Sequence, residues 1–318
     1  MKLSFTILIL YFVMSAVPLH EYHVVLSLLS LLPITAILLL VLIQIILLAA
    51  RWYLLAKAAG SHLSLRISVY GILMSFFFSQ GLPASVGGDA FRIWWHRREG
   101  IFTGVALKII FFDRIYGLLS LVILCSLSLI MLTKIFGNST IITSLIFLVT
   151  IIGLMLALLM MPCRLGVTNF INVIASELPR LVRMIIQWVT SMRSALSKQP
   201  LMMTLILLLL GCLTHLMVVL QVYVIGSYLT HDQVNLMMCL AVVPPALLIS
   251  YMPFSIAGWG VREASLVVAF GLFGIHASSA IIISIVIGMS ILAISLVGGL
   301  VWVAGGYRAA YVDSSADC

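Results

Sequence analysis

The sequence predicts an all-α polytopic membrane protein with about six spanning helices and two re-entrant hairpins of broken helix. Of the 318 residues, 64% are hydrophobic and only 8% are charged, whereas soluble domains are about 45–50% apolar and about 25% charged. Apolar runs of about 20 residues or more, enough to cross a bilayer as helix, recur at Val24–Ala50, Ile141–Met161, Leu201–Leu229 and Ala280–Ala304. They lack the alternating pattern of barrel strands, so the class is helical.

Charges near the two ends of the chain indicate its orientation. The first apolar segment, Leu3–Leu19, has no clean small-residue cleavage site after it, so we interpret it as a retained helix rather than a signal peptide. Lys2 and Arg308 flank the first and last spans, and cytoplasmic loops carry an excess of lysine and arginine. We therefore expect one transmembrane domain over residues 1–318, in the plasma (inner) membrane of a bacterium, with both termini cytoplasmic.

One pattern occurs twice in the chain. PASVGGDAFR begins at Pro83 and PFSIAGWGVR begins at Pro253, so both copies have serine at +2, glycine at +5 and arginine at +9. Each copy follows an apolar stretch, and the first stretch, Ser68–Leu82, is only 15 residues long. If it crossed the membrane, Arg92 and the arginines after it would lie outside, against the charge rule. A hairpin that enters, breaks and returns avoids this conflict.

The two hairpins, at about 68–98 and 235–275, are predicted to have opposite topology. The first enters from the cytoplasmic side and the second from outside, which makes the two halves an inverted repeat. Paired segments interrupted by glycine and proline in corresponding positions of two halves indicate the binding site of an alternating-access carrier. Non-helical backbone at membrane depth is tolerated where it lines a cavity or is buried in protein.

The net charge of +8 indicates which kinds of molecule the protein binds. Residues 164–200 form a basic, amphipathic stretch that we expect on the cytoplasmic surface. There the excess charge suits anionic lipid. Nucleic-acid binding is not expected, because no soluble module is left to carry a basic face. The five cysteines are scattered singly and are interpreted as packing residues.

The two repeated arginines, Arg92 and Arg262, are the first candidates for binding a substrate. Each falls where a half-helix would begin beside glycine-rich backbone, and helix N-termini and arginine forks both favour anions such as phosphate. Capping the hairpin or pairing with a neighbouring carboxylate is the alternative role. The backbone around them completes the candidate site, with close approach allowed by glycine: Ser85, Gly87, Gly88, Ser255, Gly258 and Gly260.

Four further charged residues belong to the candidate site. Asp89 is interpreted as a structural partner of its neighbouring arginine. For Glu263 two roles stay equally open: structural pairing with its arginine, or binding a cationic headgroup or a proton. Asp113 and Arg114 fall in an otherwise apolar span, where charge costs on the order of 2.5–3.5 kcal/mol. They line the cavity, or they form a salt bridge that fixes this helix to the first hairpin. His215 and Gln221 are expected to make interhelical hydrogen bonds.

Known catalytic and cofactor motifs are not evident in the chain. There is no P-loop, no HExxH, no DxD and no serine–histidine–aspartate arrangement, and the histidines lack the spacing of metal ligands. We therefore expect no cofactor, no metal and no enzymatic activity.

The motifs at residues 83–92, 113–117 and 253–263 resemble the lysylphosphatidylglycerol synthase transmembrane region, or flippase-like, family. The resemblance covers most of the chain and implies that Arg92, Asp113, Arg114, Arg262 and Glu263 are the functional core. Members of this family move lysyl-phosphatidylglycerol between leaflets or are linked to hopanoid and polyprenyl-phosphate lipids. The soluble aminoacyl-transferase domain of the full-length synthase is absent from this sequence, so lipid aminoacylation is not expected.

The expected function is therefore that of a lipid translocase for an anionic or phosphate-bearing headgroup, with anionic phospholipid or polyprenyl- or hopanoid-type lipid as its partner. A lipid-headgroup or prenyl-linked transferase that uses an acidic residue as base is one alternative. A scaffold for lipid-biosynthesis enzymes, docked through residues 164–200, is another. Glycine pairs in the last span, such as Gly298-Gly299, also suit packing within one chain or in a homo-oligomer.

Overall fold

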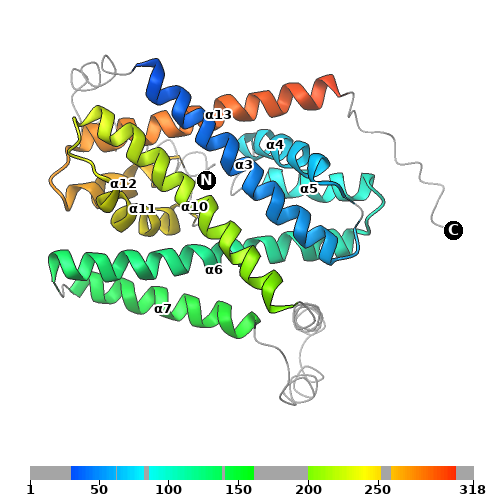
Figure 1. Ribbon diagram of the computed structural model, residues 1–318, viewed down its shortest axis with the longest axis horizontal. Helices are drawn as coiled ribbons and strands as arrows, with labels where there is room; N and C mark the ends of the chain where they lie inside the picture. The colour runs from blue at the N-terminus through cyan, green and yellow to red at the C-terminus, as the bar shows by residue number, and fades with distance from the viewer. Residues whose placement is uncertain are drawn as a thin grey trace.

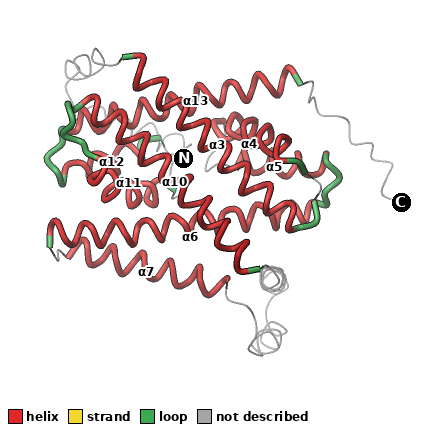
Figure 2. Tube along the Cα trace, viewed as in Figure 1, coloured by secondary structure: helices red, strands yellow, loops and turns green. Residues whose placement is uncertain are grey.

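The computed structural model describes residues 30–61, 63–81, 86–137, 140–160, 200–251 and 259–305. These parts of the chain form helices joined by turns and contain no strand (Figures 1 and 2). The helices are α3 (Leu31–Ala58), α4 (Leu65–Gly81), α5 (Val86–Arg98), α6 (Thr103–Phe136), α7 (Thr140–Met160), α10 (Leu201–Leu229), α11 (Leu236–Ser250), α12 (Val261–Gly271) and α13 (Ala277–Ala304). The expected all-α class is confirmed.

Helix length separates two kinds of element. In the described chain, four helices are long and apolar enough to cross a membrane, namely α3, α6, α10 and α13. The paired helices α4 and α5 have 17 and 13 residues, and α11 and α12 have 15 and 11. At 1.5 Å per residue each reaches about 17–26 Å, less than the roughly 30 Å of a hydrocarbon core. They form two hairpins, at the positions where the repeated motif lies.

The two halves of the described chain follow the same plan. A long helix, two short helices and a second long helix occur in this order as α3–α6 and again as α10–α13. The contacts between the halves also correspond: α4 packs against α13, and α11 packs against α6. The first long helices of the two halves, α3 and α10, make the most extensive contact and run side by side in Figure 1. Each hairpin therefore packs against the last long helix of the other half.

Small residues allow the close packing of these helices. A Cβ atom added at Gly298 on α13 would collide with the backbone carbonyl of Leu73 on α4. Gly226 on α10 likewise packs against Val234 and Ile283. In a membrane, where lipid is as apolar as the protein core, such close contact is a principal source of helix association.

Several sequence expectations lie outside the described residues. These are the first helix at 3–19, the basic segment at 164–199, the C-terminal arginine at 308, and the tips of both hairpins at 82–85 and 252–258. One boundary is corrected. The apolar run Val24–Ala50 places Arg51 in the basic loop that follows it, but α3 continues to Ala58 and carries Arg51 into the protein interior. Alanine, tryptophan, tyrosine and leucine around it prolong the helix, and ion pairing permits its burial.

Candidate functional site

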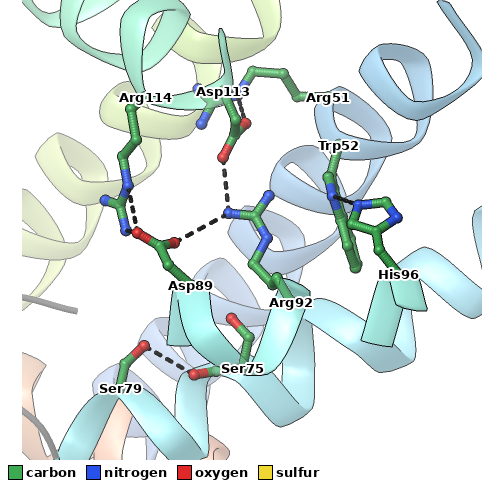
Figure 3. A network of polar contacts seen from close by, with 9 residues as sticks. All are labelled: Arg51, Trp52, Ser75, Ser79, Asp89, Arg92, His96, Asp113 and Arg114. Atoms are coloured by element: carbon green, nitrogen blue, oxygen red, sulfur yellow. Dashed lines mark hydrogen bonds and ion pairs between the residues drawn. The ribbon is translucent and has the colours of Figure 1, made fainter. Parts of the chain in front are cut away.

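Five charged residues from three helices form one network, which we call the first charge cluster: Arg51, Asp89, Arg92, Asp113 and Arg114 (Figure 3). Asp113 on α6 accepts hydrogen bonds from Arg51 Nε at 2.7 Å and from Arg92 Nη1 at 3.0 Å. Asp89 on α5 accepts from Arg114 Nη2 at 2.8 Å and lies 3.7 Å from Arg92 Nη1. The cluster thus ties the first hairpin to both long helices of its half.

Helix geometry explains why these residues meet. Asp89 and Arg92 are three residues apart on α5 and share one face, which is turned toward α6 (Figure 3). Asp113 and Arg114 are adjacent on α6 and reach different partners, with Asp113 directed to the buried arginines and Arg114 to the rim. Asp89 lies within ion-pair distance of Arg92, as expected, but accepts its hydrogen bonds from Arg114. Of the two roles left open for Asp113 and Arg114, salt bridges between α6 and the hairpin are present.

The first charge cluster has a buried interior and a partly uncovered rim. Arg51, Arg92 and Asp113 are almost wholly enclosed by protein. At the rim, the side chains of Asp89 and Arg114 remain 25% and 45% exposed. Three arginines and two carboxylates give these five residues a net charge of +1.

Arg92 is the least satisfied member of the cluster. It is only 5% exposed, and its Nε and Nη2 atoms are buried without a hydrogen-bond partner. These two N–H groups point in the same direction along one edge of the guanidinium, the edge that binds two oxygens of a carboxylate or phosphate. A buried donor left unpaired costs about 1–3 kcal/mol. The fork that these two groups form is therefore unpaired in the described structure.

Tryptophan and histidine support Arg92 from one side. The guanidinium carbon of Arg92 lies 4.8 Å from the centre of the Trp52 ring, a distance at which a cation is attracted to the face of an aromatic ring. Trp52 in turn donates its Nε1–H to His96 Nε2 at 2.9 Å. His96 lies one turn after Arg92 on α5, so α5 holds both neighbours of the indole (Figure 3).

The second copy of the motif builds a smaller cluster, which consists of Arg262, Glu263 and Ser284. Arg262 donates from Nη2 to Glu263 Oε1 at 2.8 Å and from Nε to Ser284 Oγ at 2.7 Å. Its guanidinium carbon lies 5.0 Å from the ring of Trp259, as that of Arg92 does from Trp52. The fork of Arg262 is already occupied, and the charges of the second cluster balance.

Glu263 also caps the N-terminus of α12. Its Oε2 accepts a hydrogen bond from the backbone N–H of Gly260 at 2.5 Å. Gly260 has a φ of 86°, a left-handed conformation that glycine adopts without a steric penalty. The carboxylate is thus structurally paired with the N-terminus of α12 and with Arg262.

The glycines of the first motif pack against protein. Gly87 and Gly88 are buried on α5, and a Cβ at Gly88 would collide with Ser79 Oγ and lie 2.8 Å from the Ser75 carbonyl oxygen on α4. Three other candidate residues, Ser85, Ser255 and Gly258, lie outside the described residues.

The two polar residues of α10 make the interhelical bonds expected of them. His215 Nε2 lies 3.0 Å from the carbonyl oxygen of Gly117 on α6. Gln221 donates to Gln44 on α3 at 3.0 Å. Both contacts lie where α10 crosses a long helix of the other half.

Sequence reasoning missed Arg51, Trp52 and His96. One available signal was the spacing between Gln44 and Arg51 on α3, because residues seven apart lie on the same helix face and two polar groups there indicate a polar interior. Within the described residues no group of three or more histidine, cysteine, aspartate or glutamate side chains could hold a metal ion.

The fold and the charge clusters define a polytopic α-helical membrane protein with a charge cluster where each helical hairpin meets the long helices of its half. The chain belongs to the lysylphosphatidylglycerol synthase TM region family, whose model matches residues 1–299. This membership confirms the resemblance seen in the sequence and indicates a function connected with membrane lipids. No curated protein matches the chain.

Proposed function

We propose that this protein is a lipid translocase that moves a lipid with an anionic or phosphate-bearing headgroup between the leaflets of the membrane. The observation that carries the proposal is the unpaired fork of Arg92, which is buried in a cluster of five residues with a net charge of +1. Two parallel N–H donors on a cation match two oxygens of a phosphate. Family membership supports a lipid as the molecule that bears this group.

The rim of the first charge cluster supplies a route for the headgroup. Asp89 and Arg114 are partly uncovered, and charged groups within membrane segments face water-filled cavities or the bundle interior. A headgroup could pass along this polar rim while its tails stay in lipid. The Arg92 nitrogens themselves are fully enclosed, so the hairpin must move before an anion reaches them.

The correspondence between the two halves supports alternating access. Each hairpin packs against the last long helix of the other half, and each places an arginine over a tryptophan. Inverted repeats of this kind expose one site to each side in turn by rocking against each other. The fork of Arg262 is held by Glu263 in the described conformation, so a headgroup there would compete with that carboxylate.

Basic residues at one end of the first half favour a cytoplasmic position for that end. Lys57, Arg66, Arg97 and Arg98 flank the turns that join α3 to α4 and α5 to α6, and all four are exposed. The excess of positive charge on cytoplasmic loops favours this orientation. It is the orientation in which the first hairpin enters from the cytoplasm, in the inner membrane of a bacterium.

The contacts of Asp113 and Glu263 favour translocation over a transferase reaction in which either residue is the base. A general base needs a free electron pair directed at its substrate. Asp113 accepts from two arginines, and Glu263 accepts from an arginine, a serine and a backbone amide. These bonds stabilise both carboxylates as anions and occupy the oxygens that a base would use.

Reconstitution tests the proposal. The purified protein is placed in phosphatidylcholine vesicles containing a trace of phosphatidylglycerol labelled on one tail, and the arrival of inner-leaflet label at the outer surface is followed by quenching. Arg92→Gln should slow transfer by about tenfold to a hundredfold, because a hydrogen bond to a charged group is worth about 1.5–3 kcal/mol. Arg97→Gln, an exposed arginine on the same helix, is the matched control and should transfer at the wild-type rate. Equal rates for Arg92→Gln and the wild type would refute the assignment.

A further inference from the structure

His215 on α10 is a buried group that the proposed site does not use. It is only 4% exposed, and its Nε2 lies 3.0 Å from the Gly117 carbonyl oxygen. A carbonyl oxygen can only accept, so Nε2 must carry the hydrogen in this bond. The other ring nitrogen, Nδ1, then has a free electron pair, and it is buried without a partner.

The other buried histidine of the described chain has the reverse arrangement. His96 Nε2 accepts the Trp52 Nε1–H, and an indole N–H can only donate. A proton on His96 Nε2 would therefore break an existing hydrogen bond. A proton on His215 Nδ1 would leave the bond to Gly117 intact. Of these two residues, only His215 can be protonated without losing the hydrogen bond it makes.

The charges around His215 come mainly from the first charge cluster. From α3, the guanidinium of Arg51 reaches the space beside Gly117 and Gly211, the latter one turn before His215. On α6, Asp113 lies one turn before Gly117, and from the end of α11 the Tyr251 ring lies 6.0 Å from the His215 ring in an edge-on contact. The sequence of α13 contains no titratable residue.

The geometry points to His215 as a proton-binding site that is coupled to the anion site at Arg92, an inference that rests on the proposed function. Arg51 and Arg92 share Asp113 as counterion. Without a ligand, both the burial of His215 and the positive charge of Arg51 beside it oppose a proton on the ring. An anion in the Arg92 fork offsets the net positive charge of the first charge cluster. The electrostatic repulsion of a proton on His215 then falls. Because such coupling is reciprocal, a proton on His215 also strengthens binding of the anion. The proton and the anionic headgroup would then cross the membrane together.

Proton uptake measured on ligand binding tests the coupling directly. Dihexanoyl phosphatidylglycerol is a phosphodiester that does not titrate near neutral pH, so any proton taken up on binding belongs to the protein. It is added to the full-length protein in uncharged detergent and weak buffer, with a pH dye as the readout. The wild type should take up as much as one proton per bound lipid, and its affinity should rise by up to tenfold for each unit by which the pH falls.

Variants at His215 and at one control position separate His215 from other causes of pH dependence. His215→Gln retains an N–H that can donate to Gly117 but cannot titrate, and should bind the lipid without proton uptake; His215→Asn is a second non-titrating variant if the first fails to fold. His276→Gln, at the exposed start of α13, should behave as the wild type. Binding by the wild type without uptake, or uptake that persists in the non-titrating variants, overturns the coupling alone. No binding of the lipid by the wild type at any pH would overturn the proposed function as well.

Discussion

Removing the carboxylate of Asp113 should destabilise the protein more than any other single change in the first charge cluster. The side chain is almost wholly buried and bonds Arg51 at 2.7 Å and Arg92 at 3.0 Å. Asp113→Asn keeps the shape but removes the shared counterion, and it places an N–H₂ donor against a guanidinium donor. Leaving a buried charge without its partner costs about 3–5 kcal/mol, so we expect a loss of unfolding free energy of this size.

Titration of the protein in mixed micelles with a denaturing detergent, followed by tryptophan fluorescence, measures this loss. Asp89→Asn is the control, because its partner Arg114 is 45% exposed and exposed ion pairs contribute about 0–1 kcal/mol. Adding Arg51→Gln to Asp113→Asn should recover part of the loss, since one unpaired charge is then removed. Equal stability of the Asp113 and Asp89 variants would refute the argument that the buried pairs hold the hairpin in place.

Three further changes test the packing and the second cluster in the same titration. Gly88→Ala should lower the free energy of unfolding by about 1–3 kcal/mol, because the added Cβ lies 2.8 Å from the Ser75 carbonyl oxygen. Unchanged stability would mean that α4 and α5 can move apart at no cost. Trp52→Phe keeps a ring beneath the buried arginine but removes the donor to His96, for a loss of about 1 kcal/mol, and an unchanged midpoint would count against that bond. Glu263→Gln breaks the ion pair with its neighbouring arginine and should cost about 3 kcal/mol; a loss below 1 kcal/mol would show that the pair contributes little.

The hairpins could be predicted because their signal is local. A proline followed by glycines favours a break in a membrane helix, and an arginine nine residues later has to remain near water or a partner. The repetition of this pattern at Pro83 and Pro253 predicted two hairpins in corresponding places. The lengths of α4 and α12 agree with that prediction, since both are too short to span.

The partners of the charged residues were harder to predict. Asp113 meets Arg51 across 62 positions of sequence, and no local pattern specifies such a distant contact. Arg51 directly follows an apolar run, a position typical of a basic residue at the end of a membrane-spanning helix. Only the continuation of α3 to Ala58 and the fit of its face against α6 turn Arg51 inward. The vacant fork of Arg92 depends on the same tertiary arrangement, because Asp113 draws Nη1 and leaves the opposite edge unpaired.

The central claim is that the protein moves an anionic lipid across the membrane without changing it. The most direct test places the purified wild type in vesicles with tail-labelled phosphatidylglycerol, measures how much of the inner-leaflet label reaches the outer surface, and then determines the mass of the recovered lipid. Label that is protected in protein-free vesicles should become accessible when the protein is present, and the lipid mass should stay the same. Label that remains protected with protein present, or a recovered lipid of altered mass, would contradict it.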